Sequence, residues 1–314
     1  MPLLSKPLPV FGILAAIIVL IFLLPKKCHS TDEPPHSTLT AQDEAILKNF
    51  TITRDFAYGE NDKQKMDIYA PRETKGAPII LFLHGGGYKI GDKSSRLGFI
   101  NKVTRWVPQG LIVISMNTRL FPEADGYTQA DDFAHAIVAV QKHAVEWGGD
   151  PKKLIIMGHS SAGHLVSLLT AKPSLVYDLG GLPWLGGLSL DSSSMDIPQT
   201  MASGHPGFFD EAFGKDPDMW VKSSPINNLS SESLPLFAAC SLQRGDRPCQ
   251  KVMDYSKAAK IYGARVDVFP VDYDHGQVND RLGTDCDYTK EAEKFMASLD
   301  KEVEKRLGSG QNKP

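Results

Sequence analysis

The stretch "MGHSSAGHLV", residues 157–166, decides the fold of this chain. It follows a short apolar run, "KLII", leads into "LVSLL", and places Ser160 and Ser161 side by side at the junction. A serine hydroxyl is a poor nucleophile by itself. It needs a base within hydrogen-bond reach, a third group that orients the base, and donors for an oxyanion. If one of these serines is a nucleophile, the rest of the chain must supply those partners.

Steric crowding separates the two serines. On a tight strand-to-helix turn, the residues two before and two after the nucleophile come into close contact, so both must be small. For Ser160 these neighbours are Gly158 and Ala162, whereas for the second serine they are His159 and Gly163. Because an imidazole does not fit the crowded position easily, the sequence predicts Ser160 as the nucleophile. The bland alternative is that the pair caps a helix.

A second motif, "HGGGY" at residues 84–88, ends an earlier apolar run. Three glycines let the backbone approach a substrate and turn N–H groups toward it. We therefore expect this glycine loop to present N–H groups to a substrate, and the N–H of Ser161, the residue directly after the nucleophile, to donate to an oxyanion.

Strand-like and helical patterns alternate on both sides of these motifs. Continuous apolar runs ended by glycine or polar residues are typical of strands buried on both faces, and the run at 131–147 carries its apolar residues on one helical stripe. The alternation predicts an α/β fold with a mostly parallel central sheet and helices on both faces. The segment "KMDIYAP" (65–71) alternates and reads as a strand, and continuous apolar runs follow at "APIILFLHGGG" (77–87), "LIVISMNTRL" (111–120) and "KKLIIMG" (152–158). The strand series continues with "GGLSLDS" (186–192), "LPLFAAC" (234–240) and "ARVDVFPVD" (264–272).

A base and an acid should follow the nucleophile in the order acid, then histidine. His275 lies just after the last apolar run, on a loop before a helix, and is the predicted base. Asp246 is the only carboxylate of the loop "SLQRGDRPC" and precedes that histidine by one helix and one strand, so it is the predicted acid. Asp191 and Asp272, each near a strand end, are weaker rivals. A surface-turn role is the bland alternative for Asp246.

Residues 172–228 break the regular alternation and are rich in loops and aromatic residues. They predict a small cap-like insertion over the carboxyl edge of the sheet. Candidate substrate-binding residues are Trp184, Phe208 and Trp220 from this insertion, together with Tyr88 of the glycine motif. The alternative is that the insertion's aromatic residues form its own small core.

The first thirty residues differ from the rest. Residues 7–25 carry no charge and are long enough to be a short membrane anchor or the core of a signal peptide. Both alternatives place the catalytic part outside the cytoplasm, with membrane contact only through this segment. A buried core helix is a third alternative. Residues 31–49 read as a linker with a lead-in helix, 50–307 as the catalytic domain, and 308–314 as a disordered tail.

Composition limits the partners. The formal net charge is −3, so no global basic field points to nucleic acid. No metal or other cofactor is expected, because no metal-ligand motif is present. The oligomeric state is not predicted.

Four cysteines remain to be placed. Cys28 lies beside the apolar segment, and Cys240 lies in an apolar strand-like run, where a small core residue is expected. Cys249 and Cys286 fall in polar loops, and in an exported protein a disulfide between these two is a plausible prediction.

Over residues 50–305 the chain resembles carboxylesterases of the hormone-sensitive-lipase type of α/β hydrolase, and within them the bifunctional feruloyl and acetyl-xylan esterase-like hydrolases. The matching pieces are "MDIYAP", "HGGGYKIGDK", "NTRLFPEADGYTQADDFAHAIVAV", "GGDPKKLIIMGHSSAGHL", "SLQRGDRPC" and "DHGQVN". The departures from the family pattern are Ala162 at the turn and Cys249 in the acid loop.

The resemblance implies an α/β-hydrolase fold and a triad of Ser160, Asp246 and His275, acting through an acyl-enzyme on small or short-acyl esters. It also implies an oxyanion hole made by the N–H groups of Gly85, Gly86 and Ser161. Two rivals remain. A kynurenine formamidase-like enzyme would use the same motifs on an N-formyl amide, and a non-catalytic binding module could use the same fold. The module is disfavoured because such proteins characteristically lose a triad member, and here all three are present.

Overall fold

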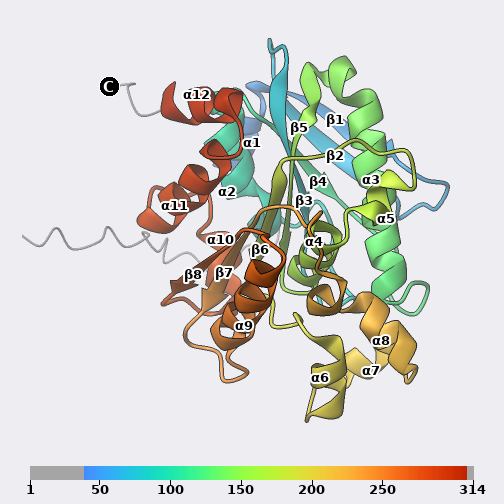
Figure 1. The fold of residues 1–314 in the computed structure, drawn as a ribbon. Helices are drawn as coiled ribbons and strands as arrows, with labels where there is room; N and C mark the ends of the chain where they lie inside the picture. Colours follow the sequence, from blue (N-terminus) through green and yellow to red (C-terminus); the bar gives the residue numbers. More distant parts are fainter. Residues whose placement is uncertain (1–38, 310–314) are drawn as a thin grey trace, which may run out of the picture.

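The computed structural model describes residues 39–309, whose centre is an eight-stranded sheet with the strand order β1-β2-β4-β3-β5-β6-β7-β8 (Figure 1). β1 and β2 pair antiparallel, as do β2 and β4, and every later pair is parallel. The strands are β1 (Phe50–Ala57), β2 (Lys65–Pro71), β3 (Ala77–Leu83), β4 (Ile112–Met116), β5 (Gly149–His159), β6 (Gly186–Leu190), β7 (Leu236–Ser241) and β8 (Val266–Val271). The predicted α/β class and mostly parallel sheet are confirmed.

Helices connect the strands and cover both faces of the sheet. They are α1 (Ala41–Leu47), α2 (Arg96–Trp106), α3 (Gly126–His143), α4 (Ser161–Ala171), α5 (Ser174–Tyr177), α6 (Ile197–Ala202), α7 (Phe208–Phe213), α8 (Pro217–Ser223), α9 (Pro248–Ile261), α10 (His275–Asp280), α11 (Asp287–Ala297) and α12 (Lys301–Ser309). Short 3-10 turns occupy Val107–Gln109, Ala144–Trp147 and Pro225–Asn228.

The central strand β3 explains the continuous apolar runs. All seven of its residues are buried, because it pairs with β4 on one side and β5 on the other while helices cover both of its faces. Alternate side chains enter different cores. Ile79 and Leu81 join the cluster under α3 and α4, whereas Ile80 and Phe82 join the cluster under α2, α11 and α12. A strand buried on both faces carries no polar alternation.

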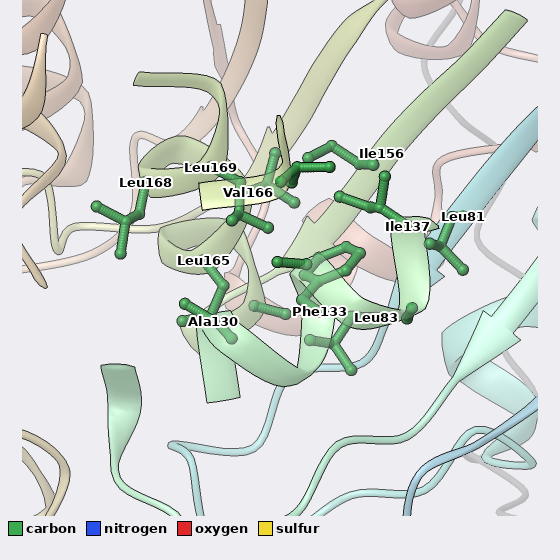
Figure 2. Packing of buried hydrophobic residues seen from close by; sticks show 14 of the residues in the cluster. Leu81, Leu83, Ala130, Phe133, Ile137, Ile156, Leu165, Val166, Leu168 and Leu169 are labelled. Carbon is green, nitrogen blue, oxygen red and sulfur yellow. The ribbon is translucent and has the colours of Figure 1, made fainter. Parts of the chain in front are cut away.

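Figure 2 shows the packing of α3 and α4 against the central strands. Phe133 and Ile137 of α3, Leu165 of α4, and Leu81 and Ile156 of the sheet belong to one buried cluster. These five side chains are fully buried, and their packing fixes the position of α4 against the sheet. The first residue of α4 directly follows the predicted nucleophile. Truncating Phe133 to Ala should cost about 3–5 kcal/mol of unfolding free energy.

The C-terminal helical stretch is divided into two helices, α11 and α12. The side chain of Asp300 accepts a hydrogen bond from the Glu302 N–H at 2.8 Å, so it caps a new helix start. This capping hydrogen bond stabilises the N-terminus of α12 and so favours a break between α11 and α12.

Short helices α6, α7 and α8 gather at one end of the sheet, at the bottom of Figure 1. They come from the stretch at 172–228 that breaks the regular alternation. The predicted anchor or signal segment at residues 1–30 and the first part of the linker lie outside the described residues. Between residues 39 and 309, no helix combines the length and apolarity needed to cross a bilayer.

The structure corrects the predicted disulfide. Cys249 is bonded to Cys240, with Cα atoms 5.1 Å apart, and so does not pair with Cys286. Cys240 is fully buried at the end of β7, as expected, while Cys249 stands in the first turn of α9. The disulfide therefore holds the first turn of α9 beside the end of β7, the strand that precedes it.

Candidate active site

The predicted nucleophile turn is present between β5 and α4. Ser160 has φ 58° and ψ −119°, a conformation that L-residues rarely adopt. A methyl group added to Gly158 would lie 2.5 Å from the Ala162 carbonyl oxygen and 2.9 Å from its methyl group. The two small neighbours of Ser160 therefore do touch, as the steric argument requires, and the strained turn holds the Ser160 hydroxyl out of the sheet.

His275 faces this serine from the other end of the chain. Its Nε2 lies 2.9 Å from Ser160 Oγ, which places it to accept the hydroxyl proton. His275 is the first residue of α10, just beyond β8. Asp274 caps that helix by accepting from the Gln277 N–H at 2.8 Å. The structure therefore brings the predicted nucleophile and the predicted base together.

The carboxylate beside His275 belongs to Asp191, not to Asp246. Asp191 Oδ2 lies 2.6 Å from His275 Nδ1, and its Oδ1 accepts from the Ser241 N–H at 2.8 Å. Asp191 directly follows β6, and its side chain is 0% exposed. The prediction that Asp246 contacts His275 is therefore wrong. Asp191, the weaker rival in the sequence, occupies that position.

Asp246 is occupied elsewhere. Its carboxylate forms a two-pronged ion pair with Arg244, at 2.9 Å from Nε and 2.6 Å from Nη2, and its side chain is 41% exposed. The sequence signal for Asp191 was its position immediately after the apolar run "GGLSL", next to the nucleophile strand. The sequence favours Asp246 because this residue follows a later strand and is the only carboxylate of its loop.

Asp191 is held in its charged form. Burial alone would raise its pKa, but hydrogen bonds from His275, the Ser241 N–H and Arg244 outweigh burial and lower the pKa below its usual value. Arg244 Nη1 lies 3.0 Å from Asp191 Oδ2 and donates to the Asp191 carbonyl oxygen at 2.7 Å. A buried carboxylate with these donors can orient the histidine ring.

The glycine motif lies beside the serine. A methyl group on Gly85 would approach Ser160 Cβ to 3.0 Å, and Gly86 has φ 136°, which only glycine adopts readily. His84 anchors this loop through its Nδ1, 2.7 Å from the Gly85 carbonyl oxygen. Ser161 is the first residue of α4, so its N–H has no intrahelical acceptor. These positions are consistent with the predicted oxyanion donors.

Sequence reasoning missed one contact of His159. Its Nε2 donates to the His275 carbonyl oxygen at 2.9 Å, and the two rings pack with centroids 4.5 Å apart. Burial, together with nearby His275, lowers the pKa of His159 to about 3, so the ring stays neutral and keeps one N–H to donate. His159, which lies between Gly158 and Ser160 in the turn, therefore contacts the predicted base.

The C-terminal end of α10 is held by a lysine of α2. Buried Lys102 of α2 donates to Asn279 twice, to the carbonyl oxygen at 3.0 Å and to Oδ1 at 2.9 Å. Burial lowers the pKa of Lys102 to about 7. Both ends of the short helix that begins with His275 are therefore held by neighbouring elements.

A cavity of about 590 Å³ opens over the serine. Of the four predicted substrate-binding residues, Phe208 and Tyr88 line it, although Tyr88 is nearly buried and its hydroxyl lies 3.1 Å from His164 Nδ1. The other lining residues include Ser192, Ser193, Ser194, Phe209, Arg244, Asp246 and Lys251.

The two predicted tryptophans do not line this cavity. Trp184 is buried just before β6 and packs edge-on against Tyr177, with ring centroids 5.8 Å apart. Trp220 packs within the insertion and donates its indole N–H to the Gly214 carbonyl oxygen at 3.1 Å. Core packing explains both positions, so the alternative of a small core in the insertion holds for these two residues.

Known proteins share this arrangement of elements. Residues 66–176 match the BD-FAE family. The match covers β2 through α4 and confirms the predicted resemblance over that part of the chain. A solved structure titled a truncated form of carbohydrate esterase from gut microbiota superposes with a TM-score of 0.67 at 19% identity. It covers 80% of this chain and 97% of that one, which shows the α/β-hydrolase fold.

Two curated relatives complete the comparison. Gut esterase 1 of Caenorhabditis elegans is 30% identical over 158 residues, covering 48% of this chain and 26% of the relative. Kynurenine formamidase of Danio rerio is 22% identical over 235 residues, covering 73% and 76%. The matched region thus spans about a quarter of the length of gut esterase 1, and most of the formamidase.

Proposed function

We propose that this protein is a serine hydrolase of carboxylic esters, in which Ser160 is the nucleophile, His275 the base and Asp191 the acid. The observation that carries the proposal is the hydrogen-bonded series from Ser160 Oγ to His275 Nε2 and from His275 Nδ1 to Asp191 Oδ2. Nucleophile, base and orienting acid in this geometry are what acyl transfer through a covalent ester needs.

Acylation begins with attack of Ser160 Oγ on the ester carbonyl carbon, while His275 Nε2 takes the hydroxyl proton. The resulting oxyanion accepts hydrogen bonds from the Gly85, Gly86 and Ser161 N–H groups, each of which contributes roughly 10²–10³ in rate. When the tetrahedral intermediate collapses, the bond to the leaving oxygen breaks. His275 returns its proton to that oxygen, and the alcohol departs.

Deacylation repeats these steps with water. His275 Nε2 takes a proton from the water, whose oxygen attacks the acyl carbon, and then returns the proton to Ser160 Oγ as the acid leaves. Asp191 accepts from His275 Nδ1–H throughout. It thereby fixes the tautomer with a free Nε2 and stabilises the imidazolium between the two transfers.

The cavity favours small or short-acyl esters. Its volume of about 590 Å³ is bounded on one side by Phe208, whose ring lies 3.7 Å from the position a methyl on Gly87 would take. Buried Ser192, Ser193 and Ser194 supply hydroxyl groups on another side. An apolar wall with a few polar groups is typical of small-molecule sites.

Amide hydrolysis is the second candidate, and the similarity to kynurenine formamidase over 73% of this chain favours it. The same three residues would cleave an N-formyl amide, with His275 protonating the leaving amine. Turnover of an N-formyl arylamide, set against that of the matching aryl acetate, separates the two activities.

Export remains part of the proposal. The uncharged stretch at residues 7–25 would anchor the protein or direct its secretion, with the catalytic domain outside the cytoplasm. Cell fractionation with N-terminal sequencing of the mature chain tests this.

The direct test is hydrolysis of p-nitrophenyl acetate and butyrate by the full-length protein and by Ser160→Ala, with Ser161→Ala as the control. We expect Ser160→Ala to abolish turnover, and Ser161→Ala to retain it because only the backbone of that residue takes part. Activity in Ser160→Ala would overturn the assignment. A folded wild-type protein that is inactive on esters and amides would favour a binding module.

A further inference from the structure

Arg244 contacts two carboxylates on opposite sides. Its Nη1 contacts Asp191 at the carboxylate (3.0 Å) and at the carbonyl oxygen (2.7 Å), while its Nε and Nη2 hold Asp246. Asp191 is 0% exposed and Asp246 is 41% exposed, so the guanidinium bridges the buried acid and the cavity wall. Nη1 also lies 3.1 Å from His275 Nδ1.

We propose that Arg244 is a positioning residue for the triad: it locks the side chain of Asp191, and Asp246 in turn holds Arg244 in place. This inference rests on the proposed function, since it assigns an indirect role in the same reaction. It also gives Asp246 a role, because the carboxylate that the sequence predicts as the acid instead anchors the residue that orients the acid.

The geometry of Asp191 shows why a clamp is needed. Asp191 has φ 54°, a strained conformation for a residue with a side chain, and it directly follows the last residue of β6. One Nη1 group binds both its carbonyl oxygen and its Oδ2, which fixes the carboxylate relative to its own backbone. The Ser241 N–H holds the other oxygen at 2.8 Å. With both oxygens fixed, Oδ2 points at His275 Nδ1.

The loop that carries Arg244 is itself tied down. The Cys240–Cys249 disulfide closes it at the base, and Gln243 Nε2 donates to Asp272 Oδ1 at 3.1 Å. Ser241 Oγ donates to the Tyr273 carbonyl oxygen two residues before His275. The loop that carries Arg244 is thus joined both to Asp191, which follows β6, and to the segment after β8 that leads to His275. Small shifts of this loop would change the distance between Asp191 and His275.

Asp246 reaches the triad only through Arg244. It makes no hydrogen bond or ion pair with another residue in the described part of the chain. Any effect of Asp246→Asn on turnover should therefore vanish when Arg244 is already absent. This dependence separates a positioning chain from two independent surface contributions.

A matched control lies at the start of β8. Arg265 and Asp267 form the same two-pronged pair at the same sequence spacing, and Asp267 is 40% exposed, but this pair lies away from the cavity. Arg265→Met and Asp267→Asn therefore report the cost of breaking such a pair without touching the triad.

The experiment is a double-mutant cycle on kcat and KM for p-nitrophenyl butyrate, with Arg244→Met, Asp246→Asn, the double variant and Arg244→Lys, each checked by its melting temperature. We expect Arg244→Met to lower kcat about 10- to 100-fold with KM changed less than about three-fold, because a misplaced catalytic group costs rate. Asp246→Asn should lower kcat several-fold in the wild type and not at all in Arg244→Met. Arg244→Lys should recover part of the loss, because one ammonium can contact Asp191 but cannot also fork onto Asp246.

The proposal is overturned if Arg244→Met keeps wild-type kcat, if the effects of the two single variants simply multiply, or if the Arg265 and Asp267 controls lose as much. Its failure is distinct from failure of the proposed function. In the first case the wild type turns over in a Ser160-dependent way and the cycle shows no coupling, whereas in the second the wild type does not turn over at all.

Discussion

The side chain of His159 contacts both the backbone and the imidazole ring of His275. The Nε2–H of His159 donates to the His275 carbonyl oxygen at 2.9 Å, and the ring centroids are 4.5 Å apart. Since His159 immediately precedes Ser160, the strained turn that carries Ser160 also contacts His275. The proposed nucleophile and the proposed base are therefore positioned relative to each other by one segment of chain.

Two substitutions separate the contributions of this contact. His159→Phe keeps a ring against His275 but loses the donor, whereas His159→Gln keeps a donor and loses the ring. We expect kcat for p-nitrophenyl butyrate to fall about ten-fold in the Phe variant and less in the Gln variant. Steady-state kinetics checks this, and a Phe variant with unchanged kcat would show that the bond to the His275 carbonyl is dispensable.

The turn tolerates no added methyl group at Gly158. Gly158→Ala would place its methyl 2.5 Å from the Ala162 carbonyl oxygen, so the turn must open. We expect a loss of about 1–3 kcal/mol of unfolding free energy, together with loss of turnover. Gly207→Ala, where an added methyl meets nothing within 4 Å, is the control and should change neither urea unfolding nor activity. Equal behaviour of the two variants would contradict the crowding argument.

Lys102 should make stability depend on alkaline pH. Burial lowers its pKa to about 7 from an ordinary value of 10.5, so between these values the unfolded chain binds a proton that the folded chain does not. Stability should therefore rise with pH in this window, by about 1.4 kcal/mol per pH unit at most. Lys102→Met removes this contribution.

The measurement is the free energy of urea unfolding from pH 7 to pH 10 for wild type, Lys102→Met and the exposed Lys257→Met. The difference between wild type and Lys102→Met should grow more favourable to the wild type as pH rises, whereas Lys257→Met should track the wild type. A difference that is constant with pH would mean that Lys102 titrates normally.

The Cys240–Cys249 disulfide should stabilise the fold through its closed loop. For a loop of this size the chain-entropy estimate is about 2–3 kcal/mol. Cys249→Ala should lower the unfolding free energy by about that amount. If Cys249→Ala leaves the urea midpoint unchanged, the bond does not stabilise the fold.

The parts of the site that follow local rules were predictable. The prediction of Ser160 depends on the small size of Gly158 and Ala162, which contact each other within one turn. The prediction of His275 depends on its place after the last strand. The fold follows from runs such as that of β3, because a strand buried on both faces is a short, continuous apolar run ended by glycine or polar residues.

The carboxylate beside His275 was not predictable in this way. Asp191 and Asp246 both follow strands and both contact Arg244, but only Asp191 lies next to His275. Such a preference is set in three dimensions by residues far apart in the chain. The roles expected for Trp184 and Trp220 failed for a similar reason, because aromatic residues in an insertion suit a core as well as a pocket.

The most direct measurement compares kcat for p-nitrophenyl butyrate in Asp191→Asn and Asp246→Asn, with the melting temperature of each. If Asp191 orients His275, Asp191→Asn should lose about 10³–10⁴ in kcat, because the histidine then adopts the wrong tautomer, while Asp246→Asn should lose only several-fold. A variant pair in which Asp246→Asn is the inactive one and Asp191→Asn turns over would contradict the triad.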